Sequence, residues 1–342
     1  MVYDNNVADI RYRGSCFRSG RVFFRSCLGI VVFMLSVHGV IYTVLMNPLQ
    51  NNNDPNTNTD ESWLVSECNV FKPNSSDNLI IGSQTPCSSF SHEREKPSLK
   101  LFVVVHSTPK ETASRDNVRR LLELLLEESA LLGIKLQINK AFMLGLSPSS
   151  LKSRGVSAAI RQEQEKYGDL VVGHYIDSHR NLTIKMMFGM SYVFYYCPMA
   201  DFILKLDDDF YFNPIQLAKL IGNAPLQKLW YGMTSSNRIP RRSANNRFFL
   251  SYTRYPYLTY PRYTFGGAIL FSQDSVSHII STHKHVPCLP FEDVFIGLCM
   301  NGYTSPKWMG LWIRADVMSG PLSECQLSGT IFVESRKYQV TF

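Results

Sequence analysis

The chain has 342 residues, of which 45% are hydrophobic and 12% aromatic, a composition that suits one large or two ordinary globular domains and excludes wholesale disorder. The net charge of +7 is unevenly distributed, because an arginine-rich N-terminal tail supplies much of it. The rest is only mildly basic, so we expect no nucleic-acid partner. The arginines of the tail are Arg11, Arg13, Arg18, Arg21 and Arg25.

An apolar run follows the tail. Residues 27–46, CLGIVVFMLSVHGVIYTVLM, contain no acidic residue, lysine or arginine, and a helix of this length reaches roughly 30 Å, the thickness of a bilayer core. A cleaved signal peptide is the alternative, but it has a shorter apolar segment and a small-residue cleavage site. The flanking arginines predict a cytosolic N-terminus. We therefore expect a cytosolic tail at 1–26 and a type II signal-anchor at 27–46.

The residues after the span are expected to be lumenal. A polar segment opens a stem at 47–96, and a folded domain is expected at 97–342. Sequons at Asn74 and Asn181 are candidate glycosylation sites. An even number of cysteines permits disulfides in an oxidising compartment, and their pairing stays open. Three of them are expected to be disulfide or core cysteines rather than nucleophiles: Cys197, Cys288 and Cys299.

From residue 97 onwards, strand-like and helix-like patterns alternate. Such alternation predicts a mostly parallel sheet with helices on both faces, and ligands bind such sheets beyond the carboxyl ends of the strands. The first helix is expected to bury Val118, Leu121, Leu122, Leu125 and Leu126. The second is expected to be capped at Ser150 or nearby and to end at Gly168. Strands are expected at 99–107, 135–145, 169–175 and 200–206, with helices at 114–132, 150–168 and 181–197.

Three consecutive aspartates, Asp207 to Asp209, follow the last of these strands. Adjacent carboxylates repel one another unless a cation neutralises them. On an extended segment Asp207 and Asp209 would face the same side, and such oxygen ligands suit Mn²⁺ or Mg²⁺ bound to a diphosphate. The alternative is a solvated acidic turn, or carboxylates that cap the helix beginning at Pro214.

A second group of candidate residues lies downstream. Gly266 and Gly267 precede the strand-like AILF and would let the backbone approach a ligand closely. Glu292 and Asp293 open an apparent helix. Their charge is favourable at a helix N-terminus, and an alternative is that one of them is a general base that deprotonates an acceptor hydroxyl.

These blocks resemble the β-1,3-glycosyltransferase family that contains galactosyl- and N-acetylglucosaminyltransferases (glycosyltransferase family 31). The similarity rests on SRDNVRRL, AFMLG, YGDLVVGHYIDSHRNLTIK, ADFILKLDDDFYFNP, YPRYTFGGAILFS and PFEDVFIGLC, in family order from Ser114 to Cys299.

The resemblance implies a GT-A nucleotide-sugar-binding fold, a Rossmann-like α/β arrangement with a mixed, mostly parallel sheet flanked by helices. It implies an inverting enzyme of the Golgi membrane that moves galactose or N-acetylhexosamine from a UDP-sugar to a sugar 3-hydroxyl on a glycoprotein or glycolipid. The cofactor would be Mn²⁺ or Mg²⁺. The alternative is an inactive, glycan-binding member of the same fold.

The resemblance also implies roles for single residues. Asp293 would be the catalytic base and Glu292 would touch donor or acceptor. Asp209 and Asp207 would hold the metal, and Lys205 would be a supporting charge. The residues expected around the donor are Arg115, Arg119, Lys205, Asp207, Asp208, Gly266 and Gly267.

Two features depart from the pattern or stay open. No histidine follows His285, although many GT-A enzymes take a late metal ligand from such a residue, so the third metal ligand is undetermined. The basic segment 235–249, SSNRIPRRSANNRFF, is either a mobile surface loop or a flap over acceptor or donor.

Overall fold

The computed structural model describes residues 68, 79–90, 98–148, 150, 155–308, 311–314 and 330–334. All of them belong to one compact unit, Pro48–Phe342. The predicted tail, membrane span and most of the stem, with Asn74, lie outside the described residues. Among the residues that are described, no helix combines the length and apolarity needed to cross a membrane.

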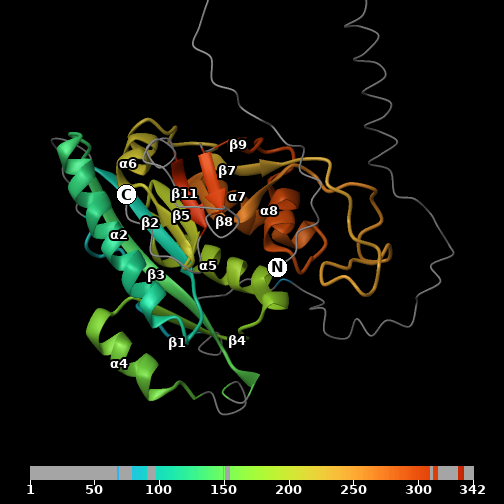
Figure 1. The fold of residues 1–342 in the computed structure, drawn as a ribbon, viewed down its shortest axis with the longest axis horizontal. Helices are drawn as coiled ribbons and strands as arrows, with labels where there is room; N and C mark the ends of the chain where they lie inside the picture. The colour runs from blue at the N-terminus through green and yellow to red at the C-terminus, as the bar shows by residue number, and fades with distance from the viewer. Residues whose placement is uncertain are drawn as a thin grey trace, which may run out of the picture. The chain divides into compact units, whose positions relative to one another are not determined.

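An eight-stranded sheet forms the centre of the domain, in the order β1-β4-β3-β2-β5-β8-β7-β9 (Figure 1). The pairings make β1 and β8 run against the other strands. The sheet is therefore mixed and mostly parallel, as predicted. Its strands are β1 (Leu79–Ile81), β2 (Leu99–His106), β3 (Leu136–Leu146), β4 (Leu170–Ile176), β5 (Phe202–Asp207), β7 (Trp230–Ser235), β8 (Tyr263–Ser272) and β9 (Lys307–Trp308).

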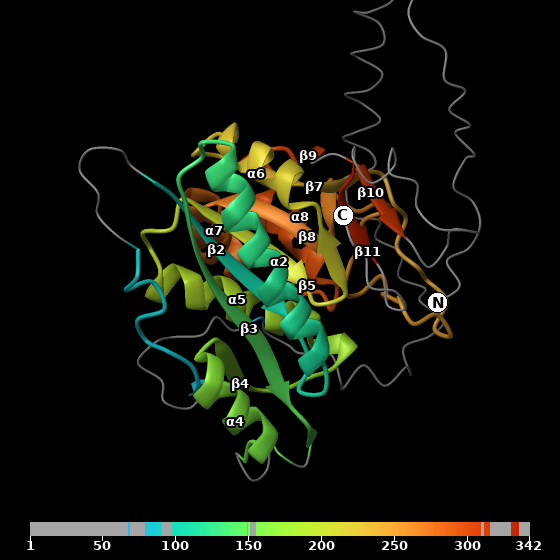
Figure 2. The ribbon, with the colours of Figure 1, turned by 60° about the vertical axis from the view of Figure 1, so that its left-hand side comes forward.

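Helices cover both faces of this sheet because its central strands are apolar on both sides. On β2, Leu101 and Val103 pack into one core, whereas Phe102 and Val104 pack into the other. The first core includes α2 (Thr112–Leu131), α4 (Ala158–Tyr167) and α6 (Pro214–Gly222), and Figure 2 shows α2 in front of the strands. The second includes α5 (Leu182–Tyr196), α7 (Gln273–Thr282) and α8 (Glu292–Met300), and short 3₁₀ turns lie at η1 (His179–Asn181) and η2 (His283–His285).

Two details of the predicted helices were wrong. Helix α4 begins at Ala158, where the Ser157 hydroxyl accepts a hydrogen bond from the Ile160 amide at 3.4 Å, so Ser157 and not Ser150 is the cap. Its end at Gly168, in the left-handed conformation with φ of 68°, is as predicted. On α2, Leu126 is 39% exposed, because it lies beside the buried stripe, which continues from Leu125 to Ser129.

A smaller sheet has the order β10-β11-β6, and its strand β6 closely follows β5 of the main sheet in the chain. Its strands are β6 (Phe210–Phe212), β10 (Leu311–Arg314) and β11 (Thr330–Glu334). Strand β5 ends at Asp207, and Asp208 and Asp209 form the turn into β6. The three aspartates thus stand at the junction of the two sheets.

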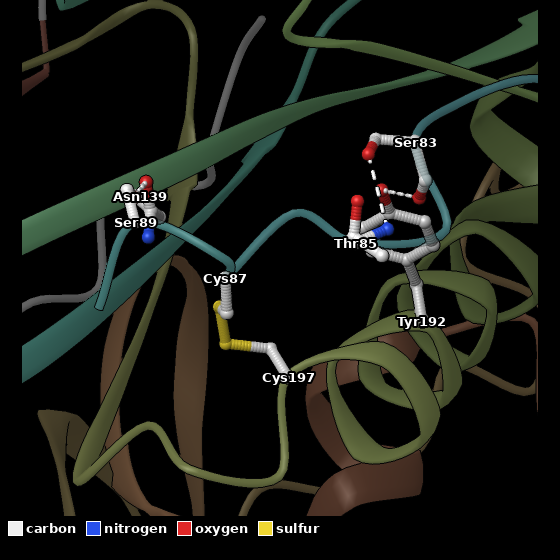
Figure 3. The surroundings of a disulfide bond; sticks show 7 residues. All are labelled: Ser83, Thr85, Cys87, Ser89, Asn139, Tyr192 and Cys197. Carbon is white, nitrogen blue, oxygen red and sulfur yellow. Dashed lines mark hydrogen bonds between the residues drawn. A yellow bond between two sulfur atoms is a disulfide. The ribbon is translucent and has the colours of Figure 1, made fainter. Parts of the chain in front are cut away.

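Two disulfides join the segment before β2 to the face of the sheet that carries α5 and α8. Cys87 is bonded to Cys197 at the end of α5 (Figure 3), and Cys68 is bonded to Cys288 just before α8. Beside the first bond, the Tyr192 hydroxyl donates to the carbonyl of Ser83 at 2.6 Å. Cys299 is buried and unpaired among the described residues. The prediction of disulfide or core roles for these cysteines is confirmed.

Candidate active site

The aspartates follow the central strand of the sheet. In register, Asp207 at the end of β5 lies opposite His106 at the end of β2. Phe102, Val104 and Ile203 pack into the core with α5, α7 and α8, and side chains alternate along a strand. His106, Lys205 and Asp207 therefore point to that same face.

Asp208 and Asp209 are arranged differently from the prediction. They lie in a turn, and the Asp208 amide donates to the carbonyl of His106 at 3.1 Å. The expectation that Asp207 and Asp209 share one side of an extended segment was therefore wrong. The reading that aspartates cap α6 is also excluded, because the side chain of Asn213 accepts from the Gln216 amide at 3.1 Å and forms that cap.

Lys205 connects the aspartates to the neighbouring strand. Its side chain is fully buried, and its ammonium donates to Asp207 Oδ1 at 2.5 Å and to the carbonyl of Gly266 on β8. A buried ammonium needs such partners because transfer of an unpaired charge out of water is very costly. Lys205 thus fixes the end of β5 against β8, and its predicted role as a supporting charge around the donor stays a prediction.

The carboxylates of Asp207 and Asp208 are only partly exposed to water, with 34% of the Asp207 side chain accessible, and other negative charges lie close to them. Desolvation, with the negative charges of Asp209 and Glu292, raises the pKa of Asp207 to about 6, although Lys205 opposes the shift. Desolvation and the same kind of repulsion raise the pKa of Asp208 to about 7. Asp208 Oδ2 is buried and has no hydrogen-bond partner among the described residues. A cation near these oxygens would relieve both effects.

The donor chemistry of the triplet fits Mn²⁺ or Mg²⁺, because hard cations prefer carboxylate oxygens. Within the part of the chain that the structure describes, no three or more His, Cys, Asp or Glu side chains are grouped to hold a metal ion. The assignment of Asp209 and Asp207 as metal ligands therefore stays a prediction.

Glu292 and Asp293 form the first turn of α8, as predicted. Asp293 Oδ1 accepts a hydrogen bond from the Val294 amide at 2.7 Å, which fixes the carboxylate at the helix N-terminus. Desolvation and the charge of Glu292 raise the pKa of Asp293 to about 8, against the opposing charge of Lys205. Such a carboxylate holds a proton far more strongly than an ordinary one, which suits a general base near neutral pH.

Gly266 and Gly267 make room for protein side chains. A Cβ atom at Gly266 would collide with the carboxylate of Glu292, and one at Gly267 would collide with the ring of Phe210, which directly follows the triplet. The two glycines therefore allow Glu292 of α8 and Phe210 of β6 to pack against adjacent residues of β8. The two predicted groups of residues, separated in sequence, are brought together here.

Arg115 is occupied by protein partners. Its guanidinium is fully buried and forms a two-bond pair with Glu163 of α4, at 2.8 and 2.6 Å. Its other donors bind Ser107 Oγ, the carbonyl of Thr108 and Thr112 Oγ1. All five N–H donors of the guanidinium are thereby used, so Arg115 fixes the loop after β2 rather than offering free donors to a diphosphate.

Arg119 extends the same network. It pairs with Asp169 at 2.8 and 2.9 Å, with Glu163 at 2.8 Å and with Asp116 at 2.6 Å. Desolvation alone would raise the pKa of Glu163, but hydrogen bonds from Arg115 and Arg119 lower it below its ordinary value. The donor contact predicted for these two arginines stays untested, and the observed bonds are structural.

His106 is a site residue that sequence reasoning missed. It is 5% exposed, its Nδ1 lies 3.9 Å from Asp207 Oδ1, and neither ring nitrogen has a hydrogen-bond partner in the described part of the chain. Desolvation, with the charges of Lys205 and Lys185, holds its pKa well below the ordinary value. Its position as a polar residue at the carboxyl end of an apolar strand was the available signal.

Lys185 and Asp177 complete the edge of the site. The Lys185 ammonium donates to the carbonyl of Ser107 at 2.6 Å and to Asp177 at 2.8 and 3.0 Å. Asn181, the described sequon, is half-buried, and its Nδ2 donates to the carbonyl of Ile176 at 2.9 Å. Its glycosylation stays a prediction.

Comparison with known proteins gives the family to which the chain belongs. The galactosyltransferase family model matches residues 126–306, more than half of the chain, so the protein belongs to that family. Its mixed, mostly parallel sheet flanked by helices is the GT-A-like arrangement that the resemblance implies.

Individual relatives agree with this membership. Human beta-1,3-galactosyltransferase 5 is 32% identical over 165 residues, 48% of this chain and 52% of the relative. The lactosylceramide 1,3-N-acetyl-beta-D-glucosaminyltransferase of Xenopus tropicalis is 30% identical over 167 residues, 48% of this chain and 44% of the relative. The alignments thus span about half the length of these relatives. Among solved structures, the match to mouse xyloside xylosyltransferase 1 covers 70% of this chain and 98% of that protein, at 12% identity with a TM-score of 0.31.

Proposed function

We propose that this protein is an inverting, metal-dependent β-1,3-hexosyltransferase that moves galactose or N-acetylhexosamine from a UDP-sugar to the 3-hydroxyl of an acceptor glycan. One observation carries the proposal. Lys205 binds both Asp207 and the Gly266 carbonyl, and its charge also acts on Asp293, so the acidic triplet and the candidate base share one site. Relatives named as β-1,3-galactosyl- and 1,3-N-acetylglucosaminyltransferases support the linkage.

In this mechanism the chain divides the work between the end of strand β5 and the start of helix α8. Asp293 accepts the proton of the acceptor 3-hydroxyl as that oxygen attacks the anomeric carbon from the face opposite the leaving diphosphate. Lys205 holds the carboxylate of Asp207 in place, and the hydrogen bond from the Val294 amide holds that of Asp293. The carboxylate of Glu292 lies against Gly266, and in this mechanism it contacts the donor sugar or the acceptor. A single displacement needs no covalent enzyme intermediate.

Asp207, Asp208 and Asp209 would bind the divalent cation and the donor. When bound, such a cation neutralises the charge that develops on the departing diphosphate. Arg115 would support this site by fixing the loop after β2 that carries Ser107 and Thr108, and Arg119 would support it through Glu163 and Asp169.

The test is a donor screen on the purified full-length protein, with and without Mn²⁺, scored by product linkage. We expect a β-1,3 product with one UDP-hexose or UDP-N-acetylhexosamine. Asp293→Asn should lower kcat by about 10²- to 10⁴-fold, the usual contribution of a general base, while UDP binding survives. Near-normal turnover by Asp293→Asn would refute the base assignment.

A second candidate is a glycan-binding protein of the same fold without turnover. The strongly raised pKa of Asp293 favours the enzyme, because a binding protein has no need of a desolvated base. Absence of turnover with every UDP-sugar, from a protein that still binds UDP, would favour the binding protein.

The proposed setting is the Golgi lumen, with a type II signal-anchor at 27–46. Two disulfides support an oxidising compartment. Protease protection of intact Golgi vesicles tests this: an epitope at the C-terminus should be protected and one at the N-terminus cleaved, and the opposite result would reject the topology.

A further inference from the structure

The imidazole of His106 has no role in the mechanism above. His106 ends β2, and in register it lies opposite Asp207 at the end of the neighbouring strand β5 (Figure 1). Its side chain points to the same face of the sheet as Phe102 and Val104, which belong to the apolar core on that side. A polar ring therefore stands at the carboxyl end of a parallel strand, where sheets of this kind bind ligands.

This histidine is buried without a hydrogen-bond partner. It is 5% exposed, and neither ring nitrogen forms a hydrogen bond within the described residues. A buried polar group without a partner costs stability, and the large majority of such groups in folded proteins have one. His283 is equally buried and follows that rule, because its Nδ1 donates to the carbonyl of Ile280 at 2.8 Å. The nitrogens of His106 thus indicate a partner that the described residues do not supply.

The charged side chains around His106 are bonded to other groups. The ammonium of Lys205 binds Asp207, and that of Lys185 binds Asp177. Desolvation, with the charges of these two lysines, holds the pKa of His106 well below its ordinary value. The ring is therefore neutral near neutral pH, and one of its nitrogens donates a hydrogen bond while the other accepts one.

The distance to Asp207 indicates where the partner would lie. Nδ1 of His106 is 3.9 Å from Asp207 Oδ1, which is too long for a direct hydrogen bond. One oxygen atom at about 2.8 Å from each of these atoms would bond to both. The side chain of Asp207 is partly exposed, so a ligand can reach the carboxylate. A hydroxyl fits this place, because it can donate to the carboxylate and accept from the imidazole N–H.

We propose that His106 is a donor-binding residue that shares one hydroxyl of the nucleotide sugar with Asp207, either on the ribose or on the transferred hexose. The hydroxyl donates to the Asp207 carboxylate and accepts from His106 Nδ1. The bound donor thereby supplies the partner that the imidazole lacks in the protein alone. This inference rests on the proposed function, because it names a contact to the donor of that same reaction.

The first experiment separates binding from folding. His106→Leu removes both nitrogens with little change of volume, so the ligand-free protein should have a Tm no lower than wild type. The dissociation constant for UDP or for a UDP-hexose should nevertheless rise about tenfold. His283→Leu is the matched control: it breaks a hydrogen bond that the structure shows, so its Tm should fall by about 2–4 °C while the affinities stay at the wild-type value.

Two polar variants test the position of the contact. The amide of His106→Asn can stand near Nδ1 and should restore most of the affinity, whereas the longer side chain of His106→Gln should not. If His106→Leu does not fold, this pair carries the test. Equal affinities of the two variants would reject a contact at Nδ1.

Calorimetry on the full-length protein with Mn²⁺ present identifies the hydroxyl. The ligands are UDP, 2′,3′-dideoxy-UDP, UDP-galactose and UDP-N-acetylglucosamine. If the ribose makes the contact, wild type binds dideoxy-UDP about tenfold more weakly than UDP, and His106→Leu adds no further loss. If the hexose makes it, His106→Leu leaves UDP binding unchanged and weakens only a UDP-hexose. Either pattern supports the proposal.

The remaining outcomes distinguish this contact from the proposed function. If no UDP-sugar is turned over but the ribose or the hexose pattern is found, the proposed function fails and the contact stands. If transfer is normal and His106→Leu binds every ligand as wild type does, the contact is overturned and the proposed function stands. A lower Tm without loss of affinity would assign His106 a structural role and reject the contact, and so would independent losses from His106→Leu and from the dideoxy nucleotide.

Discussion

At the scale of single residues, the site depends on the absence of a side chain at Gly266 and at Gly267. Neither glycine has a positive φ, so the requirement is space rather than backbone conformation. Glu292 occupies the space over one and Phe210 the space over the other. The neighbour of Gly266 is the end of a flexible acidic side chain, so a substitution there should affect function. The neighbour of Gly267 is a buried ring, so a substitution there should affect stability.

We expect Gly266→Ala to leave the free energy of unfolding nearly unchanged but to lower kcat/KM at least tenfold, because Glu292 must move. Gly267→Ala should destabilise the fold by about 1–3 kcal/mol, because the buried ring of Phe210 cannot yield easily. Urea denaturation and initial rates measure both variants. The reverse pattern would show that Glu292 has no positional role.

The raised pKa of Asp293 predicts a pH dependence. A base must be ionised, so kcat/KM should rise with pH and level off above about 8, the pKa of this carboxyl. A rate that stays flat between about pH 5 and 8 would contradict the assignment, since an ordinary aspartate is already ionised there.

The same shift predicts the direction of a stability effect. The folded pKa lies above the ordinary value, so ionising Asp293 opposes folding, and this loss grows as the pH rises from about 4 to 8. Asp293→Asn should therefore have a higher Tm than wild type at about pH 9. Thermal unfolding measures it, and an unchanged or lower Tm would argue against a desolvated carboxylate.

At the scale of elements, α2 and α4 are joined by buried charge rather than by apolar packing alone. Arg115 and Arg119 of α2 share Glu163 of α4, and Arg119 also binds Asp169 at the start of β4. Breaking a buried pair leaves an uncompensated charge, which costs far more than an exposed ion pair contributes. The two arginines therefore fix α2 against α4, and Arg115 also fixes the loop after β2.

We expect Arg115→Met to lower the free energy of unfolding by about 3–5 kcal/mol. Arg115→Lys should rescue little, because one ammonium cannot reproduce five donors in a planar fork. Arg120→Met, which changes an exposed arginine of the same helix, is the control. A variant Arg115→Met with wild-type stability but weakened UDP binding would instead support the direct donor contact that the sequence suggests.

At the scale of the whole domain, long-range connections hold the site. The turn of Asp208 and Asp209 joins the main sheet to the smaller one through β6. The Cys68–Cys288 disulfide closes a sequence separation of 220 and lies four residues before Glu292. Such a bond restricts the unfolded chain and also fixes the loop that leads into α8.

Cys288→Ser should therefore lower the free energy of unfolding by about 2–5 kcal/mol and weaken acceptor binding more than UDP binding. Cys299→Ala is the matched control: Cys299 is buried and unpaired among the described residues, and desolvation raises its pKa to about 12, so it should resist alkylation in the native protein. Equal losses in both variants would show that the effect is one of core packing, not of the bond.

Much of the framework was predictable because it rests on local pattern. Apolar runs such as Leu99–His106 and amphipathic periodicity such as that of α2 report burial directly, and the acidic start of α8 was visible as Glu292 and Asp293. The errors have local causes as well: Ser157 displaced Ser150 as the cap of α4, and a turn replaced the extended conformation at Asp208.

The sequence by itself determined the α/β alternation, the position of the aspartates at a strand end and the family to which the chain belongs, because these depend on neighbouring residues and on the order of motifs. Only the tertiary structure decided what the polar groups bind. It paired Arg115 with Glu163 and placed Glu292 and Phe210 against the two glycines. It also left the ring nitrogens of His106 and Asp208 Oδ2 without a hydrogen-bond partner within the described residues. The reason is physical: desolvation and charge pairing depend on residues far apart in the chain, which come together only when the sheet is assembled.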